Sequence, residues 1–470
     1  MQTLPLITHS HSNSVLAWRD GEPVGAGRFL ADVAYLRSML PAGSHMLNAC
    51  GDRYRFTVGF AAALTSGKIC LLPSTHAPEM IQQLARFAPD AFCLTDHAHC
   101  TVALPQVQFP STMPAMPDNG CDESAAAFTV PDIDVAQTAA IVFTSGSTGA
   151  PVPHRKTWGA LVRNVRAGAA LSGLSDGRCH TVVGTVPPQH MYGFESTVVV
   201  VLQTGNAMVA ANAFFPADIS AALASAPAPR MLVSTPVHLR AVSESNLALP
   251  KLEHVVCATA PLSAHLAAQL EKTLNAPLLE IYGSTETGQI AVRSTARTDA
   301  WQLFHGVRLQ HGEHGTWASG GHVEQPTPMS DSIESVDEEH FLLHGRKADM
   351  VNVAGKRSSL AYLNSQLNAI PGVIDGVFFM PDDEPAQGVI RLCAFVVAPT
   401  LTRSVLMAAL RERIDVAFLP RPLVFVEALP RNPTGKLPRQ ALLTMASELG
   451  MQSPIGRAPV ACRLSQINAA

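Results

Sequence analysis

The chain has 470 residues, which is too long for one ordinary hydrophobic core and predicts two or three domains. Hydrophobic residues make up 47% of it and charged residues only 15%, a balance that excludes extended disorder and fits a well-buried globular protein. The formal net charge is −4 and no basic cluster is present, so we expect no nucleic-acid partner.

No targeting or membrane signal is found in the sequence. The first ten residues lack both a basic region and a long apolar stretch, so they do not resemble a signal peptide. The longest apolar run, near residues 197–202, is far too short to cross a bilayer. Nine cysteines are scattered without paired spacing, which predicts free thiols in a reducing compartment. We therefore expect a cytoplasmic protein without a membrane partner.

Helices and short apolar strands alternate along the first 280 residues. The segments expected to be helical are 52–63, 78–88, 157–171, 217–224 and 262–274. The segments expected to be strands are 66–72, 91–95, 181–186, 231–234 and 277–281. This alternation predicts an α/β fold with largely parallel sheets. Residues 105–134 are rich in Pro, Asp and Ser and are expected to form a surface connection.

The pattern changes after Arg346 to that of a smaller α+β unit. Its expected elements are 360–367, 372–379, 389–397, 404–413 and 423–426. We expect an N-terminal domain at 1–345, a hinge at 346–349, a C-terminal domain at 350–450 and a peripheral tail at 451–470.

A turn of small polar residues follows the apolar run 139–143, which is typical of a buried strand. The turn consists of Thr144, Ser145, Gly146, Ser147, Thr148 and Gly149. The backbone N–H groups of such a turn can converge on one anion, and the hydroxyls add further donors. The turn therefore suggests a site for the phosphates of a nucleotide, although polar turns of this kind are common.

Three more motifs follow in a fixed order: Tyr282–Gly288 (YGSTETG), Gly345–Asp349 (GRKAD) and Pro433–Lys436 (PTGK). With the polar turn, and over roughly residues 45–445, they resemble the adenylate-forming superfamily of acyl-CoA synthetases, amino-acid-activating domains and luciferases. The resemblance implies a large N-terminal domain of layered αβ sheets and a small mobile α+β lid domain. It also implies that a carboxylate attacks the α-phosphorus of ATP to give an acyl-adenylate, which a thiol then converts to a thioester.

The same resemblance assigns nucleotide-binding roles, with ATP and Mg²⁺ as cofactors. The turn 144–149 binds the β- and γ-phosphates, Glu286 is a hard oxygen ligand suited to Mg²⁺, and Thr285 bonds the α-phosphate. Adenine lies against Thr259 and Ala260, where Thr259 replaces the more usual glycine or alanine. Residues that border the adenine or the acid are Tyr282 and Gly283.

Ribose and charge-stabilising roles fall on four further residues. Asp331 precedes Gly345 by fourteen positions, the family spacing of the carboxylate that accepts both ribose hydroxyls; an ordinary loop acid is the alternative. Arg346 contacts ribose or phosphate, and Arg357 is a second phosphate contact. Lys436 bridges the carboxylate and the α-phosphate, where negative charge develops.

The acid pocket is expected around the segment 187–195. By resemblance, the pocket residues are His190, Tyr192, Gly193, Glu195, Tyr282 and Gly283. A structural role is the alternative for His190.

The sequence departs from the family pattern in the phosphate loop. Val152 stands where the family usually has lysine. Arg155 or Lys156 could supply the missing charge, or the two could form a solvated pair before the next helix. With Ala348 at the hinge and the altered Asp331 motif, this departure keeps a non-catalytic nucleotide-binding protein as a rival, against which the retained Glu286, Arg346 and Lys436 argue.

Two other patterns are set aside. Residues 173–177 match the nucleophile elbow of hydrolases, but that elbow joins a strand to a helix, whereas this one joins a helix to a strand. Residues 96–100 contain Asp, two His and Cys, yet no second ligand pair has zinc spacing.

The segments 351–360 and 371–379 further resemble the ligases of bacterial aryl-polyene and xanthomonadin pigment clusters. That resemblance implies a hydroxybenzoate-type aryl acid as substrate and an acyl carrier protein as acceptor. Coenzyme A is the alternative acceptor.

Overall fold

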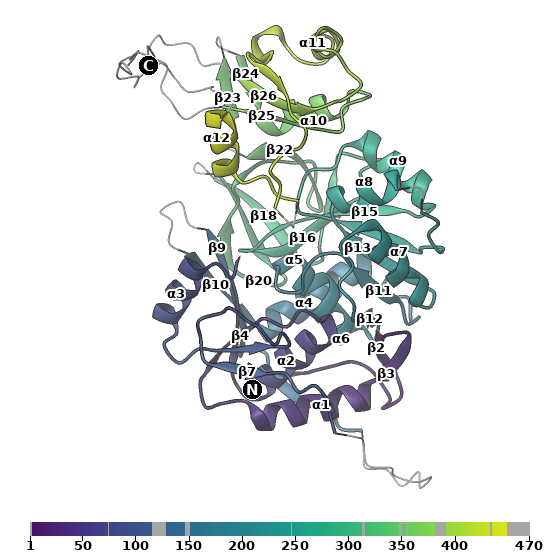
Figure 1. The fold of residues 1–470 in the computed structure, drawn as a ribbon, viewed down its shortest axis with the longest axis vertical. Coiled ribbons are helices and arrows are strands. Elements are labelled where there is room, and N and C mark those ends of the chain that lie inside the picture. The colour runs from purple at the N-terminus through teal and green to yellow at the C-terminus, as the bar shows by residue number, and fades with distance from the viewer. Residues whose placement is uncertain are drawn as a thin grey trace, which may run out of the picture. The chain divides into compact units, whose positions relative to one another are not determined.

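The computed structural model describes residues 2–73, 75–114, 128–145, 151–245, 247–312, 315–346, 350–353, 356–380, 392–432 and 435–448. The chain divides into two compact units, residues 1–348 and 349–470 (Figure 1).

One large sheet of the first unit contains six strands. In spatial order they are β10 (Pro151–Thr157), β9 (Thr138–Ser145), β5 (Ile69–Leu72), β4 (His45–Asn48), β6 (Phe92–Thr95) and β7 (Gln106–Gln108). The pairs from β9 to β7 are parallel, and β9 and β10 form an antiparallel hairpin. The hairpin pairs Ser145 with Pro151, and the turn that the sequence assigns to phosphates begins at the end of β9.

The second large sheet contains eleven strands. In spatial order they are β21 (Asp331–Ser335), β22 (His340–Arg346), β17 (Trp301–Leu303), β16 (Gly288–Arg293), β15 (Leu278–Ser284), β14 (His254–Cys257), β13 (Arg230–Ser234), β11 (Thr181–Gly184), β12 (Ala207–Val209), β2 (Val15–Arg19) and β3 (Glu22–Gly25). Pairing is parallel from β15 to β2 and antiparallel beyond them. The antiparallel extension was not anticipated from the sequence.

Helices cover both faces of the eleven-stranded sheet. On one face α7 (Pro216–Ser225), α8 (Pro236–Glu244) and α9 (Ala264–Leu274) lie side by side (Figure 1). The other face packs against α4 (Trp158–Leu171), α5 (Met191–Gly193), the π-helix η1 (Phe194–Val199) and α6 (Val200–Thr204). Successive strand residues face opposite sides, so Val182 joins one apolar cluster and Val183 the other. Burial on both faces explains why these strands are continuous apolar runs.

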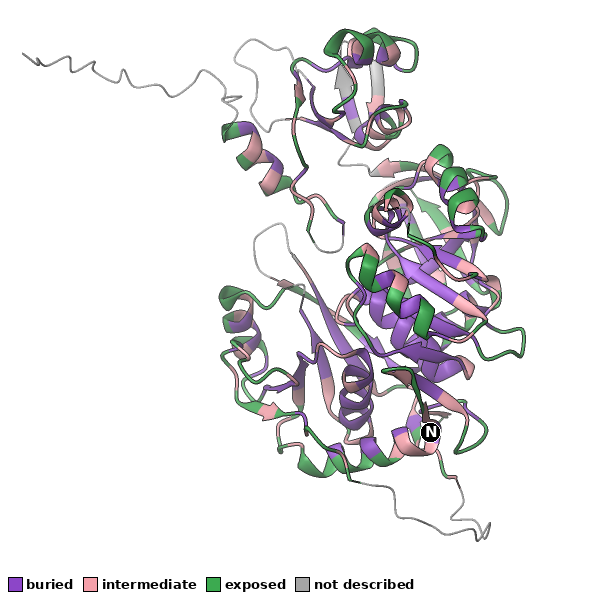
Figure 2. Cartoon of the chain, turned by 45° about the vertical axis from the view of Figure 1, so that its right-hand side comes forward, coloured by how far each residue is buried: buried purple, intermediate pink, exposed green. Residues whose placement is uncertain are grey.

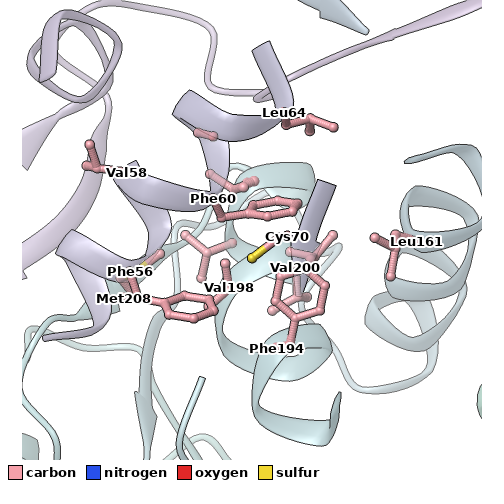
Figure 3. Close-up of a cluster of buried hydrophobic side chains, with 14 of the residues drawn as sticks. Phe56, Val58, Phe60, Leu64, Cys70, Leu161, Phe194, Val198, Val200 and Met208 are labelled. Carbon is pink, nitrogen blue, oxygen red and sulfur yellow. The ribbon is translucent and has the colours of Figure 1, made fainter. Parts of the chain in front are cut away.

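The helix α2 (Arg53–Thr65) belongs to the core between the two sheets. Nearly all its residues are buried, as expected for a helix that is apolar all round rather than on one stripe. Phe60 meets Phe194 of η1 edge to face, with ring centroids 4.9 Å apart (Figure 3). Figure 2 shows the same pattern in the large unit, with buried residues along the strands and exposed residues on the outer helices.

Arg53 ties α2 to the segment that leads into the expected acid pocket. Its guanidinium is fully buried and donates to the backbone oxygens of Gly184 (3.0 Å) and Val186 (3.1 Å) and to the hydroxyl of Thr197. Because a buried guanidinium needs such acceptors, the end of β11 and the middle of η1 are fixed to the same residue.

The remaining elements of the first unit are shorter or lie outside the two sheets. They are α1 (Ala26–Met39), α3 (Pro78–Phe87), the pair β1 (Thr3–Pro5) and β8 (Asp132–Asp134), and the sheet β18 (Val307–Gly312), β19 (Gly315–Gly320) and β20 (Val323–Pro328). The prediction that residues 105–134 are only a connection was wrong in its described parts, because β7 and β8 lie there and pair with β6 and β1, respectively.

The second unit is a small α+β fold with its own core. Its elements are β23 (Met350–Val353), β24 (Lys356–Ser359), α10 (Leu360–Asn368), β25 (Asp375–Phe379), β26 (Cys393–Val397), α11 (Arg403–Arg411), the 3₁₀ helix η3 (Val416–Phe418), β27 (Leu423–Phe425) and α12 (Arg439–Glu448). The predicted elements are all present there, with starts shifted by up to four residues. Across the described ranges, no helix is long and apolar enough to cross a membrane, and the cysteines are free thiols.

Candidate active site

The Thr285–Glu286 pair stands at the tip of the hairpin between β15 and β16. Two hydroxyls close this turn: Ser284 N–H donates to Thr287 Oγ1 and Thr287 N–H donates to Ser284 Oγ, each at 3.2 Å. Gly288 then reverses the chain at φ +74°, a conformation that favours glycine. The turn holds the backbone of Glu286 in place and leaves its side chain 41% exposed, where it can bind a ligand.

Strand β10 brings two basic side chains from the phosphate hairpin to this turn. His154 Nε2 lies 3.6 Å from Glu286 Oε1 and 2.9 Å from Thr144 Oγ1. Lys156 Nζ donates to the backbone oxygen of Glu286 at 2.8 Å. One face of β10 therefore joins the first residue of the polar turn to the expected metal ligand.

Arg155 and Lys156, the two candidates for the missing charge of the phosphate loop, have different surroundings in the structure. Arg155 is exposed and donates to the backbone oxygen of Ala136 at 3.2 Å, whereas Lys156 is buried with 8% of its surface exposed. The alternation of a strand explains the separation, because neighbouring residues point to opposite faces. Val152 is exposed and offers no charge. The solvated-pair alternative is therefore wrong for Lys156.

Burial sets the ionisation of the groups around Lys156. Burial lowers the pKa of the Lys156 ammonium, and the nearby carboxylates of Glu195, Glu286 and Glu324 oppose that shift. Burial raises the pKa of Glu195 to about 8, opposed by the charge of Lys156. Burial also lowers the pKa of His154, which favours the neutral imidazole beside Glu286.

The segment just after β14 has an unusual backbone conformation at the expected adenine position. Thr259 has φ +84°, which is rare for a β-branched residue and accounts for the small residue more usual there. A carboxylate network holds the adjoining segment, which begins at Ala260. Glu280 accepts from Leu262 N–H at 3.2 Å and pairs with Arg293 at 2.8 Å.

Tyr282 and Asp331 meet directly, although 49 positions separate them. Tyr282 donates to Asp331 Oδ2 at 2.6 Å, and its ring packs against Trp301 and Phe341 with centroids 5.5 and 5.6 Å away. Asp331 stands opposite Arg346 in the β21–β22 register. These contacts bring three of the predicted nucleotide-binding positions together and set Asp331 apart from the exposed acids that follow it.

The segment expected to line the acid pocket is tightly packed. His190 is half-buried and caps α5, its Nδ1 accepting from Tyr192 N–H at 3.3 Å. The Tyr192 hydroxyl donates to backbone oxygens of β13 and β14 at 3.2 and 3.1 Å. A Cβ at Gly193 would lie 2.2 Å from the backbone oxygen of Pro187, so only glycine fits. His190 thus has a structural role, which does not exclude the predicted contact with the acid.

Glu195 lies on the π-helix η1 and is 2% exposed. Within the described ranges its Oε1 has no hydrogen-bond partner, nor does Asn164 Oδ1. Both side chains border Gly288, since a Cβ there would lie 2.8 Å from Glu195 Oε1 and 2.4 Å from Asn164 Nδ2. Single π-turns are frequent at functional sites, and this one aims a carboxyl at the back of the Glu286 hairpin.

Lys436 belongs to the second unit and lies on an anchored turn. Arg431 bonds both oxygens of Asp375 in β25 at 2.7 and 2.8 Å and donates to the backbone oxygen of Gly435 at 2.8 Å. Asn432 Oδ1 accepts from Lys436 N–H at 2.9 Å. The turn fixes the backbone of Lys436 and leaves the residue exposed.

Several predicted site positions lie outside the described residues. They are Gly146, Ser147, Thr148, Gly149 and the hinge residue Ala348, together with the side chains of Ser145, Arg346 and Arg357. Their roles stay predictions.

The structure also argues against the nucleophile elbow and the zinc site that two sequence patterns suggested. Residues 173–177 follow α4 and precede β11, the reverse of a nucleophile elbow. Asp96 accepts from the backbone N–H groups of Gly51 (2.8 Å) and Asp52 (3.1 Å), so its carboxylate supports a turn.

The residues present fit a magnesium–nucleotide complex. Among the described residues no group of three or more His, Cys, Asp or Glu side chains could hold a metal by itself. Mg²⁺ is commonly held by one or two carboxylates together with substrate phosphates, so a dedicated cage is not needed. Glu286 supplies one exposed carboxylate and, through His154, adjoins Thr144 of the phosphate hairpin.

His154 is the site residue that sequence reasoning missed. The signal was present, because a strand over 151–157 places residues 154 and 156 on one face. That strand was not among the predicted elements, so the two residues were not considered together.

The profile of the AMP-binding enzyme family matches residues 34–344. A 4-coumarate–CoA ligase of Rhodobacter capsulatus is 31% identical over 305 residues, which cover 64% of this chain and 75% of that protein. A 3-hydroxybenzoate–CoA/4-hydroxybenzoate–CoA ligase of Thauera aromatica is 26% identical over 294 residues, covering 52% of this chain and 54% of that protein.

Two solved structures share the fold over nearly the whole chain. ATP-bound MatB of Rhodopseudomonas palustris has a TM-score of 0.78 at 17% identity, covering 94% of this chain and 97% of that one. The o-succinylbenzoate CoA synthetase of Bacillus subtilis, in complex with its acyl-adenylate intermediate, has a TM-score of 0.78 at 16% identity, covering 94% and 98%. The α/β adenylate-forming fold predicted from the sequence is confirmed.

Replacing Glu286 by Gln tests its role as a metal ligand. The change removes one anionic oxygen ligand and should cost about 2–4 kcal/mol of transition-state stabilisation, because a preorganised charge is lost. The measurement is the rate of acid activation as a function of Mg²⁺ concentration. Glu334→Gln, an exposed acid on β21, is the matched control; near-normal turnover of Glu286→Gln at limiting Mg²⁺ would contradict the assignment.

Proposed function

The chain belongs to the AMP-binding enzyme family and is an ATP-using, adenylate-forming acid–thiol ligase, and on this premise we propose that its acid is a hydroxybenzoate-type aryl acid. The observation that carries the proposal is the aromatic character of the acids in the relatives' names. They include ligases of 4-coumarate, of 3- and 4-hydroxybenzoate and of 4-chlorobenzoate.

The activation step follows from the chemistry of the assembled residues. A carboxylate oxygen of the acid attacks the α-phosphorus of ATP, a bond to the acyl oxygen forms, and pyrophosphate leaves. The turn 144–149 holds the leaving phosphates, Thr285 donates to the α-phosphate, and Asp331 accepts the ribose hydroxyls. Bound Mg²⁺ would neutralise phosphate charge beside Glu286.

We propose that cationic side chains of the protein stabilise the negative charge that develops on the α-phosphate. Lys436 is a compact point charge on a flexible stem, suited to meet both the carboxylate and the phosphate. Arg346 and Arg357 supply guanidinium donors to ribose or phosphate. Such groups accelerate the step because they are in place before the charge develops.

The acceptor proposed for the second step is the thiol of an acyl carrier protein, in a pathway that makes an aryl-polyene type of pigment. Its support is the resemblance of segments 351–360 and 371–379 to the ligases of pigment clusters. Coenzyme A is the second candidate, and the names of the relatives favour it, since those just cited are CoA ligases.

A panel of acids tests the substrate class. With ATP and Mg²⁺, pyrophosphate release should be faster with 4-hydroxybenzoate or 3-hydroxybenzoate than with acetate, amino acids or long-chain fatty acids. Equal activity on fatty acids would overturn the aryl assignment while leaving the ligase activity intact.

Thioester formation tests the acceptor. With the preferred aryl acid, we expect transfer to a carrier protein bearing a phosphopantetheine thiol to exceed transfer to coenzyme A at equal thiol concentration. Mass spectrometry of the carrier protein and chromatography of the CoA thioester measure the two products. Efficient transfer to coenzyme A alone would favour the second candidate.

Lys436→Ala tests the division of labour between the two half-reactions. Loss of one positioned charge should slow adenylation by about 10²–10³-fold. Transfer from preformed acyl-adenylate to thiol should stay near the normal rate, because the Lys436 charge is needed only while the carboxylate attacks. Arg411→Ala, another exposed cation of the second unit, is the control. An equal fall in both half-reactions of a folded Lys436→Ala protein would refute this role.

A further inference from the structure

Lys156 lies between the phosphate hairpin and the Glu286 turn, which are expected to bind different parts of the magnesium–nucleotide complex. It lies on β10 of the phosphate hairpin, and its Nζ donates to the backbone oxygen of Glu286 at 2.8 Å. It is 8% exposed. A buried ammonium is costly unless it is hydrogen-bonded, and the backbone oxygen of Glu286 supplies that bond.

We propose that Lys156 is a positioning residue that fixes the Glu286 turn against the phosphate hairpin. The bond goes to the backbone oxygen of Glu286, which leaves the carboxylate for the metal. The carboxylate is approached separately by His154, two residues earlier on the same strand face, at 3.6 Å. Two contacts of different kinds from one strand restrict both the position and the orientation of one ligand.

The contact matters because it joins two different sheets. The strand β10 is the edge of the six-stranded sheet, whereas the Glu286 turn connects β15 and β16 of the eleven-stranded sheet. The distance between the expected phosphate site and the expected metal ligand therefore stays constant only if the two sheets keep the same relative position. A charge-assisted hydrogen bond out of reach of solvent is well suited to hold that spacing.

Two acids lie in the surroundings of the buried ammonium. Glu324 accepts from Thr157 Oγ1 at 2.8 Å, and Glu195 of η1 is 2% exposed and borders Gly288, which ends the Glu286 turn. Because η1 continues the segment expected to contact the acid, that segment lies close to the same turn. The assignment rests on the proposed role of Glu286 as a ligand of the magnesium–ATP complex.

The test is direct binding of a non-hydrolysable ATP analogue by calorimetry, with and without Mg²⁺. Lys156→Met should weaken binding with Mg²⁺ by roughly 10- to 100-fold, the range expected for loss of one charged hydrogen bond, and should change binding without Mg²⁺ much less. Arg155→Met is the matched control, since it removes the same charge from the neighbouring exposed position. Equal losses in the two variants, or equal losses with and without Mg²⁺, would overturn the proposal.

A double variant separates positioning from folding. Lys156→Met alone removes the cation near the buried Glu195 carboxyl and could prevent folding, whereas Lys156→Met with Glu195→Gln leaves neither ionisable group there. We expect the double variant to melt closer to the wild-type temperature than Lys156→Met does, and still to bind the magnesium–analogue complex weakly. A double variant that binds the complex as tightly as wild type would overturn the positioning role.

The Glu286→Gln protein distinguishes the two possible failures. If Glu286→Gln keeps wild-type dependence on Mg²⁺, the metal role of Glu286 is wrong and the Lys156 assignment falls with it. If Glu286→Gln loses that dependence while Lys156→Met retains it, the assignment of Lys156 alone is wrong. The binding measurement needs no acid, so an error in the proposed acid class affects neither outcome.

Discussion

The hydrogen bond from Lys156 to the backbone oxygen of Glu286 joins two sheets that otherwise belong to separate layers. A polyphosphate and its metal span several ångströms, so their binding groups have to come from elements held at a fixed separation. Here one group is expected at the end of β9, where the polar segment begins, and the other is the turn between β15 and β16. Burial of the Lys156 ammonium costs desolvation of a charge, and its hydrogen bond to the Glu286 backbone compensates part of that cost.

The other predicted nucleotide-binding residues also lie at or near the ends of strands. Thr259 follows β14, the Glu286 turn follows β15, and Asp331 begins β21. Ligands of α/β sheets bind beyond the carboxyl ends of parallel strands, where loops can carry polar groups without disturbing the core. Buried groups behind the loops hold them in place. Glu280, paired with Arg293, supports the segment after β14. The ring of Tyr282 packs on aromatic residues, and its hydroxyl donates to Asp331.

Sequence patterns predicted the fold where the signal was strong and local. The alternation of helices and apolar strands was confirmed through α9, and α2 was found although it lacks an amphipathic stripe. The antiparallel strands between residues 288 and 346 were missed, since most of them carry exposed residues and none has a long apolar run. The short strands β7 and β8 were also missed, because each has only three residues and no apolar run, and β8 pairs with the distant β1.

For the site, the motifs identified Glu286, Tyr282 and Asp331, and the structure brings them to one region with Thr144. The choice between Arg155 and Lys156 could not be made from their types or spacing to the turn. It required the register of β10, which decides the face each side chain occupies. The position of Glu195 beside Gly288 joins residues far apart in sequence and depends on the π-helix, which no sequence pattern indicated.

Acid-dependent exchange of labelled pyrophosphate into ATP tests the central claim most directly. The claim is that this site forms an acyl-adenylate and that pyrophosphate leaves before any thiol reacts. Exchange should therefore require an aryl acid and Mg²⁺ but no thiol, and it should fall in Glu286→Gln. Absence of exchange without a thiol, or formation of ADP and phosphate in its place, would contradict the account.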